Sequence, residues 1–179
     1  MTQLSGTTAT VFEEVAFGPC NLGLAAGEVI ERVWWALGAV GIEGLAPRDP
    51  ARLSGGQSQL VALAGVLALR PKYLILDEPT SELDPAGTAL VADAIVRAAH
   101  ETGAGVLLVE HKTEVLARIA HEMVVLDGGR VALSGPTAEV LADARLAELG
   151  VEAPSRMRLE RELQAVGVHW TAALREALA

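Results

Sequence analysis

The spacing of apolar side chains predicts a helical N-terminal region. Residues 8–18 (TATVFEEVAFG) and 24–42 (LAAGEVIERVWWALGAVGI) repeat apolar positions with the period of an α-helix. Thr8 or Thr10 is the expected N-cap of the first helix. The apolar face of the second helix comprises Val29, Val33, Leu37 and Val40.

Glycine and proline mark the predicted ends of these helices. Gly-Pro at 18–19 and APRDP at 46–50 predict breaks. A third helix is predicted over residues 54–69. The Arg-Pro pair that follows it predicts its end, because a residue that precedes proline is biased away from helix.

Downstream, continuous apolar runs alternate with helical patterns. Residues 73–78 (YLILDE) and 105–111 (GVLLVEH) are apolar runs that end in polar residues, whereas 85–103 and 112–122 have helical spacing. Strands that alternate with helices are typical of a parallel sheet covered on both faces. The predicted fold class is therefore α/β.

The remaining sequence predicts a hairpin and further helices. Residues 123–135 (MVVLDGGRVALSG) predict two strands around a turn at 127–129. Residues 136–150 predict one more helix, and 155–166 and 170–178 are short amphipathic stretches.

Composition narrows the class of partner. The 179 residues carry a formal net charge of −9 and include a single cysteine, Cys20. No cluster of Lys and Arg is present, which argues against a nucleic-acid partner. One cysteine cannot form an internal disulfide, so a reducing, cytoplasmic setting fits best.

The adjacent Trp34 and Trp35 cannot share one helix face, so one is expected to pack and the other to be partly exposed.

Two carboxylates come directly after an apolar run. Asp77 and Glu78 fall at the carboxyl end of the 73–78 strand, at the edge where open α/β sheets bind ligands. There one carboxylate can hold Mg²⁺, usually through water, and the next can orient a nucleophilic water. The alternative interpretation is a solvated pair at the end of a strand.

A serine and two glycines open the third helix. In LSGGQ, residues 53–57, backbone N–H groups at a helix N-terminus favour an anion, and glycines let the anion approach closely. Ser54 is suited both to cap the helix and to donate to a phosphate oxygen. The alternative is a plain serine cap followed by loop glycines.

Two further residues have a structural and a functional interpretation. Asp84, in EPTSELDP, precedes Pro85 and is a natural N-cap for the next helix. His111 ends the LLVEH strand, where it is placed to hydrogen-bond a terminal phosphate; a lone histidine is otherwise structural or exposed.

Taken in this order, the motifs resemble the ATP-binding cassette (ABC) ATPases over about residues 8–135. The residues that match the family's signature motif are Ser54, Gly55, Gly56 and Gln57. Asp77 matches the Walker B magnesium residue, Glu78 the catalytic glutamate that polarises the attacking water, and His111 the switch histidine near the γ-phosphate. The stretch Ser81–Asp84 matches the D-loop, which couples the two nucleotide sites in the family. The resemblance implies ATP and Mg²⁺ as cofactors.

The same resemblance implies a partial P-loop NTPase core with a parallel sheet, joined to an ABC helical subdomain. Residues 1–70 match the Q-loop region and helical subdomain, 71–135 the RecA-like core portion, and 136–179 a C-terminal extension or linker. In the family, two cassettes close on two ATP molecules. Each nucleotide lies between one subunit's Walker motifs and the other's signature.

Two stretches look like the energy-coupling-factor group of these ATPases, which drives importers of vitamins and of cobalt or nickel. They are TVFEEVAFGPCNLGL (10–24) and GGRVALSGPTAEVL (128–141). The implied partners are a second ABC ATPase subunit or domain and a transmembrane coupling subunit that sits against the helical region. The implied location is peripheral, on the cytoplasmic face of the membrane, with ATP hydrolysis coupled to transport.

One family motif is missing from the sequence. The Walker A loop, G-x-x-x-x-G-K-[ST], holds the β- and γ-phosphates, and neither Lys72 nor Lys112 follows a glycine loop. The chain alone is therefore expected neither to bind ATP tightly nor to hydrolyse it. Two explanations compete: a truncated product or fragment, or a complete polypeptide whose partner supplies Walker A.

The missing portion has consequences for the sheet. The P-loop strand lies inside the sheet in this family, so a place beside the 105–111 strand should be unfilled, with exposed apolar surface. Gln3 is the one candidate for the Q-loop glutamine, although its setting better resembles a second glutamine found downstream of the Q-loop in energy-coupling ATPases.

Two other functions are compatible with the residues. A non-transport ABC ATPase of DNA repair or chromosome organisation would carry a coiled-coil insertion or a DNA-binding module, and neither is visible. A non-hydrolysing module would only complete a partner's ATP site through residues 54–57.

Overall fold

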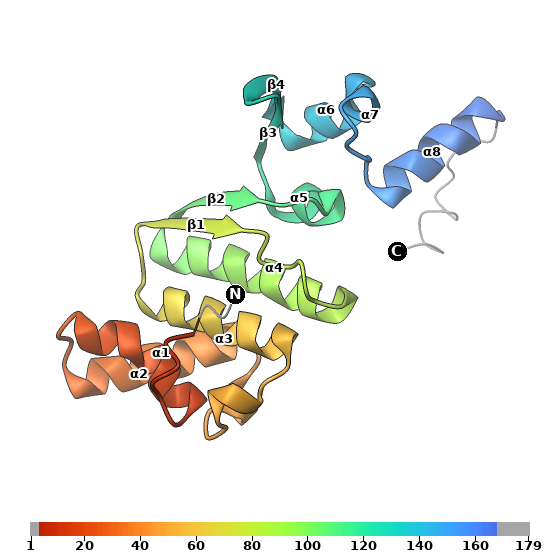
Figure 1. The fold of residues 1–179 in the computed structure, drawn as a ribbon. Helices are drawn as coiled ribbons and strands as arrows, with labels where there is room; N and C mark the ends of the chain where they lie inside the picture. Colours follow the sequence, from red (N-terminus) through yellow and green to blue (C-terminus); the bar gives the residue numbers. More distant parts are fainter. Residues whose placement is uncertain (1–3, 168–179) are drawn as a thin grey trace. The chain divides into compact units, whose positions relative to one another are not determined.

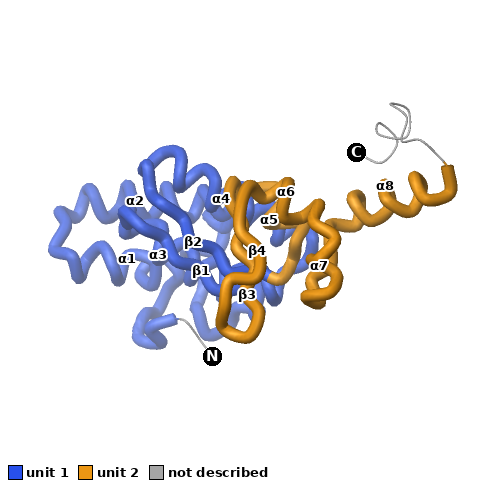
Figure 2. The backbone as a smooth tube through the Cα atoms, turned by 90° about the horizontal axis from the view of Figure 1, so that it is seen from above, with its two compact units in different colours: residues 1–110 blue, residues 111–179 orange. Residues whose placement is uncertain are grey.

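A computed structural model describes residues 4–167. The chain falls into two units, residues 1–110 and 111–179, which are coloured separately in Figure 2. None of the helices in the described part combines the length and the apolar character that a membrane crossing requires.

In residues 4–110, unit 1 contains four α-helices and a short sheet. Its elements are α1 (Val11–Asn21), α2 (Ala26–Ala39), the 3₁₀ turns η1 (Glu43–Leu45) and η2 (Pro50–Arg52), α3 (Gly55–Ala68), β1 (Tyr73–Asp77), α4 (Pro85–Thr102) and β2 (Gly105–Val109). Helices α1, α2 and α3 pack against one another. Figure 1 shows α4 running along the sheet, with α3 on the other side of α4.

Two of these helices begin with the same hydrogen-bonded cap. Thr10 Oγ1 accepts the N–H of Glu13, whose carboxylate accepts the N–H of Thr10 in return. Ser54 and Gln57 form the same reciprocal pair at the start of α3. Such capping boxes satisfy donors that a helix start otherwise leaves free, so Thr10 rather than Thr8 is the cap of α1.

The predicted helices of residues 24–42 and 54–69 are present as α2 and α3. The predicted apolar face of α2 is buried at Val29, Val33, Leu37 and Val40. Helix α3 ends at Ala68, and Arg70 has a φ of 49°, so the chain leaves the helical conformation before Pro71.

The break predicted at 18–19 is wrong, because Pro19 lies inside α1. Its buried ring removes only one helical N–H, in the last turn, so the helix is not interrupted. A Cβ atom on Gly18 would lie 2.8 Å from Cδ2 of Leu69, so glycine lets α1 approach the end of α3 closely. The break at 46–50 is confirmed, since only 3₁₀ turns lie between α2 and α3.

β1 and β2 form a two-stranded parallel sheet, as predicted. The prediction that both faces are covered is wrong for the described residues. Leu74 is only 2% exposed, whereas Ile75 and Leu107, which are opposite in register on the other face, are 72% and 60% exposed. Within residues 4–167, β2 pairs with no strand besides β1, in agreement with the expected unfilled place beside it.

Unit 2 is built around a β-hairpin. Its elements are α5 (Thr113–Ile119), β3 (Glu122–Asp127), β4 (Arg130–Pro136), α6 (Thr137–Ala142), α7 (Arg145–Glu148) and α8 (Ser155–Ala165). The strands pair antiparallel around Gly128 and Gly129, both at positive φ, which confirms the predicted hairpin and its turn. The buried apolar residues include Met123, Val125, Leu133, Val140, Leu141 and Leu146.

Residues 136–150 form two short helices rather than the single helix predicted. Asp143, between α6 and α7, has an extended backbone with ψ 129°, and its carboxylate accepts the N–H of Arg145 at 2.9 Å. This local bond competes with continuation of the helix. The amphipathic stretch predicted at 155–166 is present as α8, and the one at 170–178 lies outside the described residues.

Candidate functional site

The LSGGQ sequence forms a capped helix start. Ser54 Oγ accepts the N–H of Gln57 at 3.3 Å, and Gln57 Oε1 accepts the N–H of Ser54 at 3.1 Å. The amides of Gly55 and Gly56 have no acceptor among the described residues. Two N–H groups therefore remain available at the positive end of α3. The role of Gln57 in the cap was not predicted, although the S-x-x-Q spacing signals a capping box.

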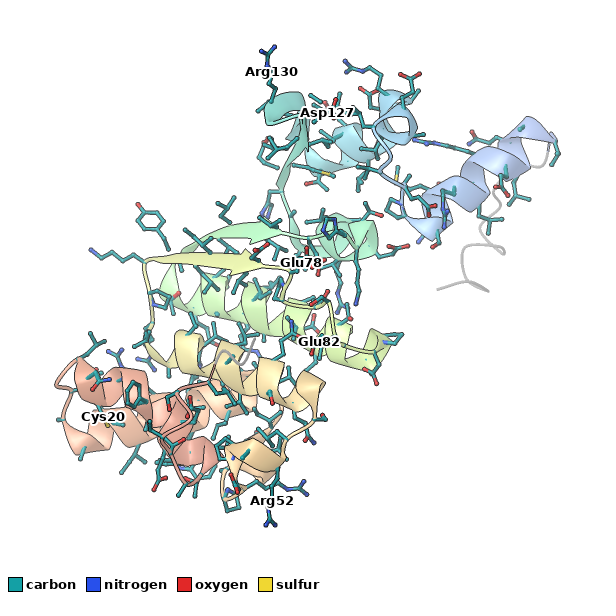
Figure 3. The ribbon with its side chains drawn as sticks, viewed as in Figure 1. Cys20, Arg52, Glu78, Glu82, Asp127 and Arg130 are labelled. Carbon is teal, nitrogen blue, oxygen red and sulfur yellow. The ribbon has the colours of Figure 1, made fainter. Side chains whose placement is uncertain are left out.

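The loop after β1 packs against the two glycines. A Cβ atom on Gly55 would lie 2.7 Å from Oε2 of Glu82, and one on Gly56 would lie 3.1 Å from Cδ2 of Leu83. Figure 3 labels Glu82 in this loop, close to the start of α3. Its carboxylate lies beside a helix N-terminus, where negative charge is favourable. Glu82 was not among the predicted residues, because no spacing rule relates it to Gly55.

Asp77 is the last residue of β1 and Glu78 follows it, as predicted; Figure 3 labels Glu78. Asp77 is exposed and Glu78 is half-buried. Glu78 has a φ of 47°, and Arg70 is the other non-glycine residue with positive φ in the described chain. The N–H of Glu78 donates to the Val109 carbonyl at 2.9 Å, and Nε2 of Gln59 donates to the Glu78 carbonyl at 3.1 Å. Helix α3 therefore contacts the backbone of Glu78 directly.

The segment from residue 79 to residue 84 is fixed at both ends. Thr80 is fully buried, and its hydroxyl donates to the carboxylate of Glu110. Asp84 Oδ1 accepts the N–H of Gly87 at 2.7 Å and caps α4, which confirms the structural interpretation of Asp84.

The structure places most of the predicted site residues in one unit. Residues 54–57, Asp77, Glu78 and 81–84 belong to unit 1. His111 is exposed, follows β2 by two positions, and is the first residue of unit 2. Gln3 lies outside the described residues.

The donors present fit a nucleotide-bound Mg²⁺ better than a metal held by protein groups alone. In residues 4–167, no three His, Cys, Asp or Glu side chains are gathered as a metal site would require. Mg²⁺ usually keeps several waters and takes one or two carboxylates plus phosphate oxygens. The exposed carboxylate of Asp77 meets that requirement.

A second candidate surface lies on α1, α2 and their connection. The rings of Phe12 and Trp34 lie 5.5 Å apart between centroids, and Trp34 is 47% exposed. Trp35 is half-buried, and its Nε1 donates to Glu101 at 2.6 Å. One tryptophan is thus packed and one exposed, as predicted. The large apolar side chains exposed in this region are Phe17, Leu22, Ile30 and Trp34.

Comparison with known proteins supports the resemblance. A family model described as "ABC transporter" matches residues 2–81. The energy-coupling factor transporter ATP-binding protein EcfA2 of Caldanaerobacter subterraneus subsp. tengcongensis is 46% identical over 161 residues, which is 89% of this chain and 56% of that protein.

Two solved structures share the fold. The structure of cbiO1 from Clostridium perfringens, part of the ABC transporter complex cbiONQ, matches 89% of this chain and 60% of its own, with a TM-score of 0.70 and 34% identity. MJ0796, a bacterial ABC transporter cassette solved as a dimer, matches 75% of this chain and 59% of its own, with a TM-score of 0.66 and 28% identity. This chain spans little more than half the length of EcfA2 or of either solved chain. With its partial P-loop NTPase core of α/β class and its motifs in family order, the chain is similar to the ABC transporter ATP-binding proteins over most of its own length.

Proposed function

We propose that this chain is part of the ATP-binding and ATP-hydrolysing subunit that energises an energy-coupling-factor importer of a vitamin or transition-metal ion. The observation that carries the proposal is the start of α3, where the amides of Gly55 and Gly56 are left available at a capped helix N-terminus. The similarity to an energy-coupling factor ATP-binding protein supports the importer class.

Each motif has a role in this proposal. Residues 54–57 and the loop around Asp84 face a nucleotide bound by the opposing subunit. Asp77 would hold Mg²⁺ through water, Glu78 would orient the attacking water, and His111 would contact the γ-phosphate. When bound, Mg²⁺ neutralises phosphate charge. Asp77, Glu78 and His111 would act on a different nucleotide, on their own side of the pair of subunits. Its phosphates require a Walker A loop, which this sequence does not contain.

The proposed organisation follows the three segments predicted from the sequence. Residues 1–70 carry the helical subdomain and 71–135 the portion of the core, while 136–179 form the extension. The exposed apolar side chains on α1 and α2 suit contact with a transmembrane coupling subunit, because patches of this kind mark interaction sites. Such contact places the chain on the cytoplasmic face of the membrane.

A second candidate function is a non-hydrolysing module that only completes the partner's ATP site. The retained Asp77–Glu78 pair at the end of β1 favours the first candidate. Both candidates use residues 54–57 in the same way.

Both candidates predict that residues 54–57 complete the partner's ATP site. This prediction is tested with a full-length energy-coupling ATPase that has an intact Walker A loop and a disabled signature motif. That partner cannot hydrolyse ATP by itself, and adding this chain should restore hydrolysis. Gly56→Asp places a carboxylate where the phosphate would approach, and should lower the restored rate about a hundredfold or more. The rate of phosphate release is the measurement.

The matched control is Ser58→Ala, on the same helix but outside the motif, which should leave the restored rate unchanged. Thermal unfolding of each variant shows that the chain remains folded. If hydrolysis is not restored, or if Gly56→Asp restores it as well as the unmodified chain does, the signature role is wrong.

A second experiment separates the two candidates. The N-terminal portion of an EcfA2-type relative, which carries a Walker A loop, is co-expressed with this chain. A hydrolytic subunit should then gain ATPase activity that Glu78→Gln lowers about a hundredfold or more. A stable complex that binds ATP without hydrolysing it supports the non-hydrolysing module instead.

A further inference from the structure

Glu78 has an unusual backbone conformation for its residue type. Its φ of 47° lies in the left-handed region, which L-residues other than glycine, asparagine and aspartate rarely adopt. A glycine at this position would adopt the same φ without steric cost. The neighbouring structure must therefore hold the Glu78 backbone in place, as is common at functional sites.

Hydrogen bonds to three partners hold this backbone. The N–H of Glu78 donates to the carbonyl of Val109, the last residue of β2. The carbonyl of Glu78 accepts from the N–H of Ser81 at 3.2 Å, within the turn that follows β1, and from Nε2 of Gln59, a side chain of α3. The bonds to Val109 and Ser81 are backbone contacts next to the sheet, whereas the bond from Gln59 connects the Glu78 backbone to the helix that begins with the signature residues.

The side chain of Gln59 is committed to this one contact. Its Oε1 atom is buried and has no hydrogen-bond partner among the described residues. Burying an unpaired carbonyl oxygen is unfavourable, so packing alone would favour methionine or leucine at this position. The amide is useful here because its N–H group reaches Glu78.

The segment after Glu78 has contacts of its own. The side chains of Thr80 and Asp84 bond to Glu110 and to the start of α4, whereas Glu82 and Leu83 lie against the glycines that open α3. Gln59 provides a side-chain hydrogen bond from the helix carrying residues 54–57 to the backbone of Glu78.

We propose that Gln59 is a positioning residue that holds Glu78 in the left-handed conformation and thereby sets the direction of its carboxylate. Because Gln59 lies on the same rigid helix as Ser54, a displacement of the start of α3 by the partner's nucleotide is transmitted to Glu78. Only the transmission of a displacement from the start of α3 to Glu78 rests on the proposed function. The contact with Glu78 stands on the geometry of unit 1.

The test is an NMR experiment on the 179-residue chain, in which the backbone carbon shifts and the amide coupling constant of Glu78 report its φ. Gln59→Met removes the donor at similar side-chain volume. It should move the Glu78 signals toward those of an ordinary extended residue. The control Ser58→Ala, one position earlier on the same helix, should leave the Glu78 signals where they are.

A second variant distinguishes a lost hydrogen bond from a general disturbance of packing. Gln59→Glu introduces a carboxyl group that can donate only when protonated. The Glu78 signals should therefore be displaced while the introduced carboxyl is ionised and return toward those of the unmodified protein as it is protonated. Burial disfavours the ionised form, so this return should begin at a higher pH than the usual pKa of glutamate. A packing defect would give no such pH-dependent recovery.

Unchanged Glu78 signals in Gln59→Met, or no recovery at low pH in Gln59→Glu, would overturn the proposal. These outcomes do not depend on any partner. The proposed function fails by a different measurement, the absence of restored hydrolysis with the signature-disabled partner. Transmission from the start of α3 to Glu78 has its own test. It is supported if the signature-disabled partner, together with ATP, moves the Glu78 signals of the unmodified chain and does not move those of Gln59→Met. Equal movement in both chains contradicts it.

Discussion

At the scale of single residues, an ion pair fixes the boundary between α6 and α7. Arg145 NH2 lies 2.6 Å from Oδ2 of Asp143. Hydrogen bonds from the side chain and the backbone of Arg145 outweigh partial desolvation and lower the pKa of Asp143 from an ordinary 3.8 to about 2. The same pair raises the pKa of Arg145.

This shift predicts a pH dependence with a definite sign. Because the folded chain lowers the pKa of Asp143, the ionised form contributes stability above about pH 4, and that contribution is lost as the pH falls toward 2. In a carboxyl-carbon NMR titration, Asp143 should have its midpoint near 2, and Arg145→Gln should move that midpoint toward 3.8. An unmodified protein that titrates near 3.8 would contradict this assignment.

At the scale of elements, the packing of α1 on α3 depends on Gly18. A Cβ atom there would lie 2.8 Å from Cδ2 and 3.3 Å from Cγ of Leu69, so the Leu69 side chain must leave its rotamer and Gly18→Ala should lower the free energy of unfolding by about 1 kcal/mol. Gly65, in the middle of α3, has no atom within 4 Å of the corresponding position. Gly65→Ala should therefore raise the free energy of unfolding by up to about 1 kcal/mol. Urea unfolding measures both changes.

The essential result is that Gly18→Ala and Gly65→Ala change the free energy of unfolding in opposite directions. If both substitutions stabilise the chain by similar amounts, helix propensity alone governs α1 and α3, and the close approach at Gly18 has no energetic importance.

The elements that the sequence predicted correctly are those determined by local patterns. The helical periods, the serine and threonine caps and the Gly-Gly hairpin turn involve residues within a few positions of one another. The two errors in helix boundaries have local causes as well: Pro19 falls in the last turn of α1, and the side chain of Asp143 bonds to the backbone of Arg145.

The contacts that assemble the candidate site were not predictable in the same way. Gln59 and Glu78 are 19 positions apart, and Glu82 meets Gly55 across another loop. No periodicity connects residues on different elements, so only the motif resemblance suggested that these segments belong together. The left-handed φ of Glu78 also has no signal in the sequence, since glutamate rarely adopts it.

At the scale of the whole molecule, the sheet has an open apolar face. Ile75 and Leu107 are 72% and 60% exposed and lie opposite each other in register. Neighbouring exposed apolar side chains on a short sheet favour association between copies of the chain. The continuous apolar runs predicted both strands correctly, but they gave no indication of which face the chain itself covers.

Polar substitution on this face should reduce self-association without unfolding the chain. The double variant Ile75→Thr and Leu107→Thr should sediment as a smaller species than the unmodified protein. Its free energy of unfolding should change by no more than about 0.5 kcal/mol per site, because both side chains are already in water. Sedimentation velocity and urea unfolding are the measurements.

Leu74→Thr is the matched control, on the covered face of the same strand. Leu74 is 2% exposed, so this substitution should cost about 2–4 kcal/mol. Equal losses of stability for the two faces would show that the face bearing Ile75 and Leu107 is covered in solution.

The parallel pairing of β1 and β2 also affects how the chain is made. Tyr73 pairs with Gly105, so the ribosome must add α4 before the first residue of β1 can find its partner. At ribosomal speeds of about 5–20 residues per second, β1 waits roughly 2–6 s as an unpaired apolar strand. During translation, that interval is the period in which a chaperone or a neighbouring nascent chain can bind it.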